Sequence, residues 1–205
     1  MLDEAAYRFD DLLAQRALVR QHPWALLVSG QDDGPPRVSP LSVVLDQAES
    51  DLTVLSHLAK SDAVAHDLGA RPVCLVVQGP SGYISPDWYG PGPYVPTCDY
   101  VTIHLSGVPE LLDEATTFEV IRRTADQFEA IRPRPWDIAP VAEMARRITR
   151  FTTGFRLRPS AVQAKAKLSQ DKPPEVVARV VRRLRDPGEP YANEALASAV
   201  EAFNA

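Results

Sequence analysis

The chain has 205 residues, a net charge of −5, and 45% hydrophobic and 24% charged residues, the ordinary balance of a globular protein. Its acidity argues against nucleic-acid binding as a bulk property, and no apolar run approaches the length of a membrane span. Two cysteines make no disulfide framework and the charged N-terminus lacks a signal-peptide core, so we expect a cytoplasmic protein.

The first third of the sequence predicts short strands around helices. Helical periodicity begins beside a capping residue, Asp10, and the polar turn 31–34 is typical of a hairpin. Ser61 or Asp62 can cap a second, shorter helix, and the continuously apolar residues 73–77 predict a strand buried on both faces. The predicted elements are helix 10–21, strands 24–29, 37–45 and 52–55, helix 63–68 and strand 72–78.

Residues 78–107 organise the chain, because a long loop is predicted between strand 72–78 and a strand over 100–106. Prolines 80, 86, 91, 93 and 96 restrict the loop backbone. Tyr83, Trp88, Tyr89 and Tyr94 lie among them and can form a wall for a flat ligand. A rigid structural crossover, whose aromatic side chains only seal the core, is the alternative.

The second half predicts further strands and helices. Alternation over residues 100–106 places His104 on the more polar strand face with Tyr100 and Thr102. The predicted elements are strand 108–112, helices 113–130 and 138–150, strands within 153–167, and helices 173–185 and 193–203. The pattern indicates an α+β fold with an antiparallel sheet, plausibly a barrel, in one domain over residues 1–205 with a helical extension from about residue 173.

Two places favour an anion. Lys60, the Ser61 hydroxyl and the free N–H groups of the following helix start would suit a phosphate or a carboxylate, although an ordinary capped helix gives the same pattern. The segment from Lys165 to Arg185 contains seven basic residues and two acidic ones. Its positive charge could bind a phosphate, a propionate or a partner. A solvated helix face is the alternative there.

Two blocks of residues carry a family resemblance. The first is Gly79-Pro-x-x-Tyr-Ile-Ser-Pro-x-Trp-Tyr89, continued by Val95-Pro-Thr-x-x-Tyr100, His104 and Gly107; the second is Gln163-Ala-Lys-x-Lys-Leu-Ser-Gln-Asp-Lys172. They resemble the PaiB family of FMN-binding negative transcriptional regulators. The resemblance implies a split β-barrel like those of flavin reductases and pyridoxamine-phosphate oxidases, and a homodimer with cofactor sites at the subunit interface. It also places residues 57–60 where related barrels hold the FMN phosphate.

Three departures separate the chain from the usual family pattern. Residues 40–42 are Pro-Leu-Ser instead of His-Leu-Pro, residues 62–65 are Asp-Ala-Val-Ala instead of Asn-Pro-x-Trp, and residues 98–99 are Cys-Asp instead of Trp-Asn. The first two fall near the expected FMN site, where an acidic Asp62 disfavours a phosphate. The sequence is similar to the piperazate synthase branch, which uses haem and closes N-delta-hydroxy-L-ornithine into L-piperazic acid by forming an N–N bond. The alternatives are an FMN-binding negative transcriptional regulator and an FMN-dependent oxidoreductase.

The cyclase chemistry needs an iron ligand, a base and cationic groups for a carboxylate. For haem b we expect His57 as the axial ligand and His104 as the second choice, with Cys98 as a thiolate alternative; FMN is the alternative cofactor. The partners expected are a small-molecule amino-acid substrate and a second copy of the chain, without membrane or nucleic acid. The expected cofactor-binding residues are His57, Lys60, Ser61, Trp88 and Lys165, and the expected catalytic residues are Tyr83, Ser85, Tyr100, His104 and Lys167.

Overall fold

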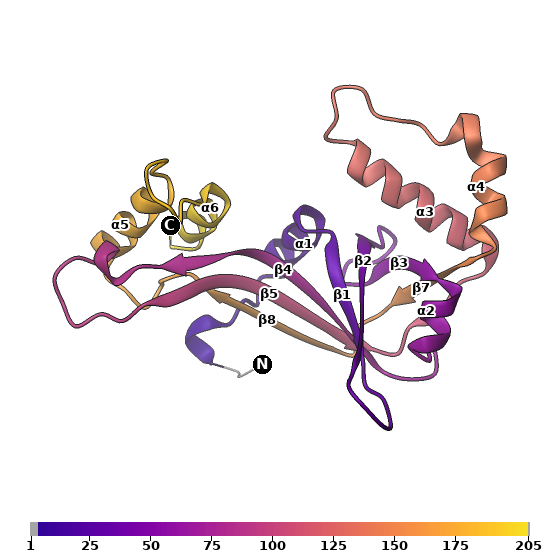
Figure 1. The fold of residues 1–205 in the computed structure, drawn as a ribbon, viewed down its shortest axis with the longest axis horizontal. Helices are drawn as coiled ribbons and strands as arrows, with labels where there is room; N and C mark the ends of the chain where they lie inside the picture. The colour runs from indigo at the N-terminus through magenta and orange to yellow at the C-terminus, as the bar shows by residue number, and fades with distance from the viewer. Residues whose placement is uncertain (1–3, 205) are drawn as a thin grey trace. The chain divides into compact units, whose positions relative to one another are not determined.

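The fold is α+β and is built on one antiparallel sheet, as the sequence predicts (Figure 1). A computed structural model describes residues 4–204. In these residues eight strands have the order β6-β7-β3-β2-β1-β4-β5-β8. The strands are β1 Trp24–Ser29, β2 Arg37–Leu45, β3 Val54–Ala59, β4 Val73–Ile84, β5 Thr97–Gly107, β6 Glu110–Leu111, β7 Thr152–Leu157 and β8 Ala161–Lys167.

Two compact units share these strands. Residues 11–77 and 104–163 form what we call the barrel unit, and residues 4–10, 78–103 and 164–204 form the hairpin unit. The barrel unit contains the helices α1 Leu12–Gln21, α2 Lys60–Ala65, α3 Glu114–Glu129 and α4 Ala142–Thr149 and the 3-10 turn η3 Ala139–Val141. The hairpin unit contains α5 Pro174–Leu184, α6 Glu194–Phe203 and the 3-10 turns η1 Ala5–Tyr7 and η2 Pro86–Trp88.

In the barrel unit, helix α3 packs on strands β2, β3 and β7. The Asp113 side chain accepts a hydrogen bond from the Thr116 N–H (2.7 Å) and so caps the helix, as predicted. Val120 of α3 is buried against Val44 of β2 and Leu55 of β3. Burial of one face of an amphipathic helix against a sheet stabilises both elements, and here it supports the strand that carries His57.

In the hairpin unit, helices α5 and α6 pack on each other (Figure 1). Asn193 links them to the sheet: its Oδ1 accepts from the Leu196 N–H (3.0 Å), while its Nδ2 donates to the Ser81 carbonyl of β4 (3.1 Å). Leu196 is fully buried, and a Cβ on Gly82 would come within 3.0 Å of it. The close approach of α6 therefore depends on a glycine in β4.

The predicted loop over residues 78–100 is largely wrong. Strand β4 continues to Ile84 and β5 already starts at Thr97, so only residues 85–96 are irregular. The glycines and Pro80 suggested a break. Pairing of β4 with β1 ends at Val77, however, so Pro80 lies beyond that ladder, where a missing N–H costs little. Asn193 then supplies a partner for the Ser81 carbonyl on this part of the strand.

Several smaller predictions also need correction. Helix α1 is capped by Asp11, not Asp10, and helix α2 starts at Lys60 behind Ala59, which has no capping side chain, so neither Ser61 nor Asp62 caps it. The third strand runs over Val54–Ala59 instead of 52–55. In β4, Cys74 and Val76 alternate half-exposed with buried neighbours, which contradicts burial on both faces. The terminal helices and the hairpin of β1 and β2 agree with prediction.

Candidate functional site

His57 lies in β3 of the barrel unit, opposite Gly154 of β7. The close packing there requires a glycine, because a Cβ on Gly154 would lie 2.6 Å from the Thr117 hydroxyl, which accepts the Gly154 N–H at 3.1 Å. The His57 Nδ1 is buried and has no hydrogen-bond partner. Burial lowers the pKa of the His57 imidazole below its ordinary value. His57 is thus a neutral imidazole with an unpartnered nitrogen, the form that a metal ion binds.

Lys60 and Ser61 follow His57 at the start of helix α2, where both side chains are exposed. Lys60 lines a hollow of about 350 Å³ together with residues of α2, β6 and β7. The Lys60 N–H donates to the Phe151 carbonyl (3.0 Å), so it is not free for an anion. Asp62 lies in the first turn. Lys60 contributes a positive charge here, while Asp62 opposes a phosphate.

His104 and Tyr100 both lie on β5 but belong to different units, His104 to the barrel unit and Tyr100 to the hairpin unit. Both side chains are half-buried. Burial lowers the pKa of His104, so its imidazole is neutral near pH 7 and able to accept a proton. The alternation that predicts these exposures is confirmed within the strand, except that Thr102 is buried.

A hollow of about 250 Å³ lies in the hairpin unit, and we call it the loop pocket. The rings of Tyr89 and Tyr94 meet at 5.0 Å and 54° on one side. The Lys172 Nζ lies 5.6 Å from the centre of the Tyr89 ring and 6.0 Å from that of Tyr94. The pocket is lined by Tyr89, Pro93, Tyr94, Val95, Pro96, Thr97, Asp99, Lys167, Ser169, Asp171 and Lys172.

Asp99 is the fully buried charged group of the loop pocket. The Ser169 hydroxyl donates to Asp99 Oδ2 (2.6 Å), whereas Oδ1 is buried without a partner. Burial raises the pKa of the Asp99 carboxyl, and the hydrogen bond from Ser169 and the charge of Lys167 only partly oppose this. Ser169 adopts a left-handed backbone conformation, with φ of 58°, at the turn that follows β8.

The other predicted residues of the hairpin unit are dispersed. Tyr83 packs against Tyr191, with ring centres 4.9 Å apart. The Ser85 hydroxyl caps η2 by accepting from the Asp87 N–H (3.3 Å), and Trp88 is buried. Lys165 forms an ion pair with Glu4 (3.3 Å) and lies over the Tyr7 ring. Lys167 donates to Thr97 Oγ1 and to the Cys98 carbonyl (3.0 Å), and alone of these residues it lines the loop pocket.

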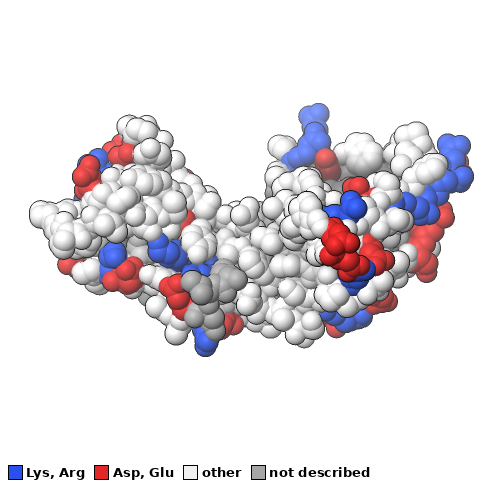
Figure 2. All heavy atoms as spheres, turned by 60° about the horizontal axis from the view of Figure 1, so that its bottom comes forward, with Lys and Arg blue, Asp and Glu red and all other residues white. Residues whose placement is uncertain are grey.

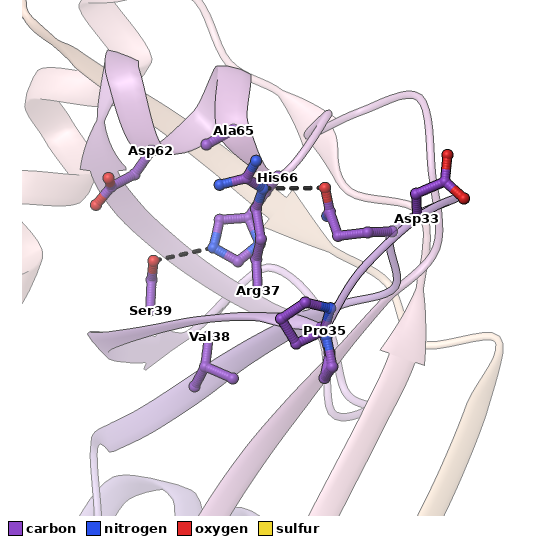
Figure 3. Close-up of a pocket in the computed structure, with 10 residues that line it drawn as sticks. Asp33, Pro35, Arg37, Val38, Ser39, Asp62, Ala65 and His66 are labelled. Carbon is purple, nitrogen blue, oxygen red and sulfur yellow. Dashed lines mark hydrogen bonds between the residues drawn. The ribbon is translucent and has the colours of Figure 1, made fainter.

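His66 is a polar residue whose environment sequence reasoning missed. It falls within the predicted short helix 63–68, but its side chain is fully buried. Its Nδ1 lies 2.8 Å from Ser29 Oγ and its Nε2 2.9 Å from Ser39 Oγ. The ring lines a hollow of about 490 Å³. Figure 3 shows it among the lining side chains, with Arg37 and Ser39 beside it. The two serines lie 37 and 27 residues away from His66 in sequence, so no local sequence pattern predicts these hydrogen bonds.

Many charged side chains of the chain pair with one another. Within residues 4–204, carboxylates pair with Lys165, Lys172, Arg183 and Arg185 of the basic segment. Figure 2 shows positive and negative side chains interspersed on one face. No group of three or more His, Cys, Asp or Glu side chains in the described part of the chain could hold a metal ion. A haem iron differs from such sites because one axial side chain can hold it.

Membrane-spanning length is not reached by any apolar helix within residues 4–204. Cys74 and Cys98 are both free, and Cys98 is exposed.

The fold is that of split-barrel proteins. The FAD and heme binding protein from Mycobacterium smegmatis superposes with a TM-score of 0.62 at 15% identity, over 84% of this chain and 79% of that one. The flavocytochrome Anf3 from Azotobacter vinelandii superposes with a TM-score of 0.57 at 20% identity, over 78% and 69%. Identities this low establish a common fold alone.

Sequence comparison defines the family. The family described as "Putative FMN-binding domain" matches residues 1–161. The "Protease synthase and sporulation protein PAI 2" of Bacillus subtilis (strain 168) is 25% identical over 167 residues, which are 80% of this chain and 79% of that protein. The chain therefore belongs to the PaiB-like split-barrel family of FMN-binding-type domains, as the motif resemblance indicated.

Proposed function

We propose that the protein is a haem-dependent enzyme that closes N-delta-hydroxy-L-ornithine into L-piperazic acid, with haem b held by His57. The observation that carries the proposal is the buried, unpartnered Nδ1 of a neutral His57 imidazole. A buried ring nitrogen without a partner costs stability, and such unpaired groups call for a functional explanation. His57 therefore fits a haem, and the exposed Lys60 and Ser61 are suited to its propionates.

The fit to FMN is poorer at the same place. The cofactor phosphate would meet Asp62 in the first turn of α2, and the Lys60 N–H is already bonded to Phe151. The short helix offers the phosphate few free donors, and its first-turn carboxylate repels it. These two features favour haem over FMN.

The reaction balances without an external oxidant or reductant. The N–O bond of the hydroxylamine and two N–H bonds of the α-ammonium break, and an N–N bond forms. One ammonium hydrogen leaves in the water and the other leaves as a proton. A bound haem iron would supply a Lewis acid that polarises the N–O bond. His104, neutral because burial lowers its pKa, is suited to take the ammonium proton.

The proposal includes a homodimer, which the family resemblance implies. The half-exposed Cys74 and Val76 of β4 are apolar surface that a second copy would cover. Light scattering coupled to gel filtration is expected to give twice the monomer mass, and a monomer mass at micromolar concentration would contradict this part.

The test is conversion of N-delta-hydroxy-L-ornithine by the holoprotein purified from cells supplied with iron and a haem precursor. Mass spectrometry is expected to find a product lighter by one water. His57→Ala is expected to lose the product, while His22→Asn, a change at the C-terminal end of α1, is expected to keep it. A haem-loaded protein that leaves the hydroxylamine unchanged would contradict the proposal.

The second candidate is an FMN-binding PaiB-like regulator, favoured by the description of the matching family and by the positive charge of Lys60. Flavin in the purified protein and a change in transcription on its deletion would support it. Bleaching of that flavin by a reduced nicotinamide would instead indicate an FMN-dependent oxidoreductase.

A further inference from the structure

The loop pocket is small. Its volume of about 250 Å³ is below the range of about 300–1,000 Å³ that drug-sized ligands occupy. A flat dinucleotide or a porphyrin does not fit into such a space, but a single small metabolite does. The charged side chains that line the pocket therefore decide which small molecule it can bind.

The acidic side of the pocket is incomplete. Asp99 has no exposed surface, and only its Oδ2 is bonded, to the Ser169 hydroxyl. The free Oδ1 is an acceptor without a donor, and a buried acceptor left unpaired is costly. The donor that such an oxygen accepts best is a cationic N–H, since charge-assisted bonds are the stronger ones.

The basic side of the pocket is formed by two lysines. Lys167 forms no salt bridge with a carboxylate in the described residues, because its Nζ donates to the neutral Thr97 hydroxyl and Cys98 carbonyl. Lys172 is bonded to the exposed Asp171 (2.6 Å) and lies over the two tyrosine rings. At least one positive charge thus remains available for an anionic group.

Uncharged aromatic side chains also line the pocket. Burial and the nearby Asp99 raise the pKa of Tyr89 to about 12, so its phenol stays neutral at physiological pH. With Tyr94 it presents apolar ring surface beside the lysines. The pocket therefore combines a carboxylate, an ammonium group and a short apolar wall, which is complementary to a molecule that carries both charges itself.

We propose that the loop pocket binds a small zwitterion of the α-amino-acid class, with the ligand ammonium on Asp99 Oδ1 and its carboxylate on Lys167. Ser169 positions the Asp99 carboxylate by its hydrogen bond to Oδ2. The inference goes beyond the proposed function because it needs neither haem nor FMN. If the cofactor proposal fails, amino-acid binding is still expected.

Calorimetric titration of the purified chain with glycine, L-alanine and L-ornithine tests the proposal. We expect at least one of them to bind. For the ligand that binds, the matched amine without the carboxylate and the matched acid without the α-amino group are expected to bind at least about tenfold more weakly. For L-ornithine these are 1,4-diaminobutane and 5-aminopentanoate. No binding by any amino acid at about 10 mM would overturn the proposal, as would equal binding by the matched amine.

Variants assign the binding to this pocket. Asp99→Asn keeps the shape and the Ser169 bond but removes the charge, and Lys167→Met removes the ammonium; each is expected to weaken binding at least about tenfold. Asp10→Asn, an exposed change in the same unit, is the matched control and is expected to bind as the parent does. Circular dichroism checks folding of each variant. Parental affinity in a folded Asp99→Asn protein would overturn the assignment.

Discussion

His57 precedes helix α2 and His66 lies at its C-terminal end, and the two differ most clearly in their hydrogen bonds. The His57 side chain is half-buried and the His66 side chain is fully buried, and burial lowers the pKa of both. Both ring nitrogens of His66 are bonded to serine hydroxyls, whereas the Nδ1 of His57 has no partner. The direction of the pKa shift therefore does not distinguish the two histidines, but their hydrogen bonds do.

The largest effect is expected from His57→Ala. Loss of the proposed haem ligand should abolish haem retention, and the unfolding free energy should change by no more than about 1 kcal/mol because no hydrogen bond is lost. The ratio of haem to protein absorbance after gel filtration measures retention. Added imidazole should restore part of the band. A variant that keeps parental haem content would break the distinction between the two histidines.

His66→Ala should show the reverse behaviour. It removes two hydrogen bonds, leaves the buried Ser29 hydroxyl unpaired and creates a cavity, so we expect the unfolding free energy to fall by about 2–4 kcal/mol. Urea denaturation measures this change. The folded fraction should still bind haem. Parental stability combined with loss of haem would show that the roles of His57 and His66 are exchanged.

Much of the fold follows from the sequence, and the failures have local causes. The hairpin of β1 and β2 and the Asp113 cap are readable because a turn signal and a capping residue act over a few positions. Strand β4 beyond Val77 is not readable, because glycine and proline there favour a break and the compensating Asn193 lies 112 residues away. Tertiary packing overrode the local preference.

For the candidate sites, the sequence predicts which residues take part but not which groups surround them. The sequence marks His57, Lys167 and the unusual Asp99, but not what surrounds them. Asp99 meets Ser169 across 70 positions, and His66 meets Ser29 across 37. Such contacts depend on strand order, which no local pattern specifies. The expectation of one domain over residues 1–205 stays a prediction, and a single unfolding transition would support it.

A smaller effect, the pH dependence of the unfolding free energy, tests whether Asp99 Oδ1 is unpaired like the Nδ1 of His57. The folded-state pKa of Asp99 is raised above 3.8, so the stability this group contributes is present at low pH and is lost as pH rises through the raised pKa. Glu119 contributes the opposite pH dependence of stability, because its hydrogen bond from Arg122 lowers its pKa to about 2. This contribution is the same in the parent and in Asp99→Asn. The difference between the parent and Asp99→Asn isolates Asp99.

Unfolding free energies measured between about pH 3 and pH 8 should show that difference. The parent should lose stability relative to Asp99→Asn as pH rises, because the buried charge forms without a partner. A parent that gains on the variant with rising pH would mean that Oδ1 is paired in solution.

The smallest effects are expected at Lys60 and Ser61. Both side chains are exposed and neither caps α2, so Lys60→Ala and Ser61→Ala should change the unfolding free energy by less than about 0.5 kcal/mol. Haem affinity should fall only a few-fold, because the charge is screened by water. Complete loss of cofactor from Lys60→Ala, with His57 intact, would show that Lys60 and not the His57 imidazole makes the main contribution to cofactor binding.

The absorption spectrum of the protein purified from cells supplied with iron and a haem precursor tests the assignment of His57 as the haem ligand. We expect a Soret band that shifts on reduction with dithionite and is missing from His57→Ala but present in His66→Ala. A two-banded flavin spectrum, or a Soret band that His57→Ala retains, would contradict the assignment of His57 as the haem ligand.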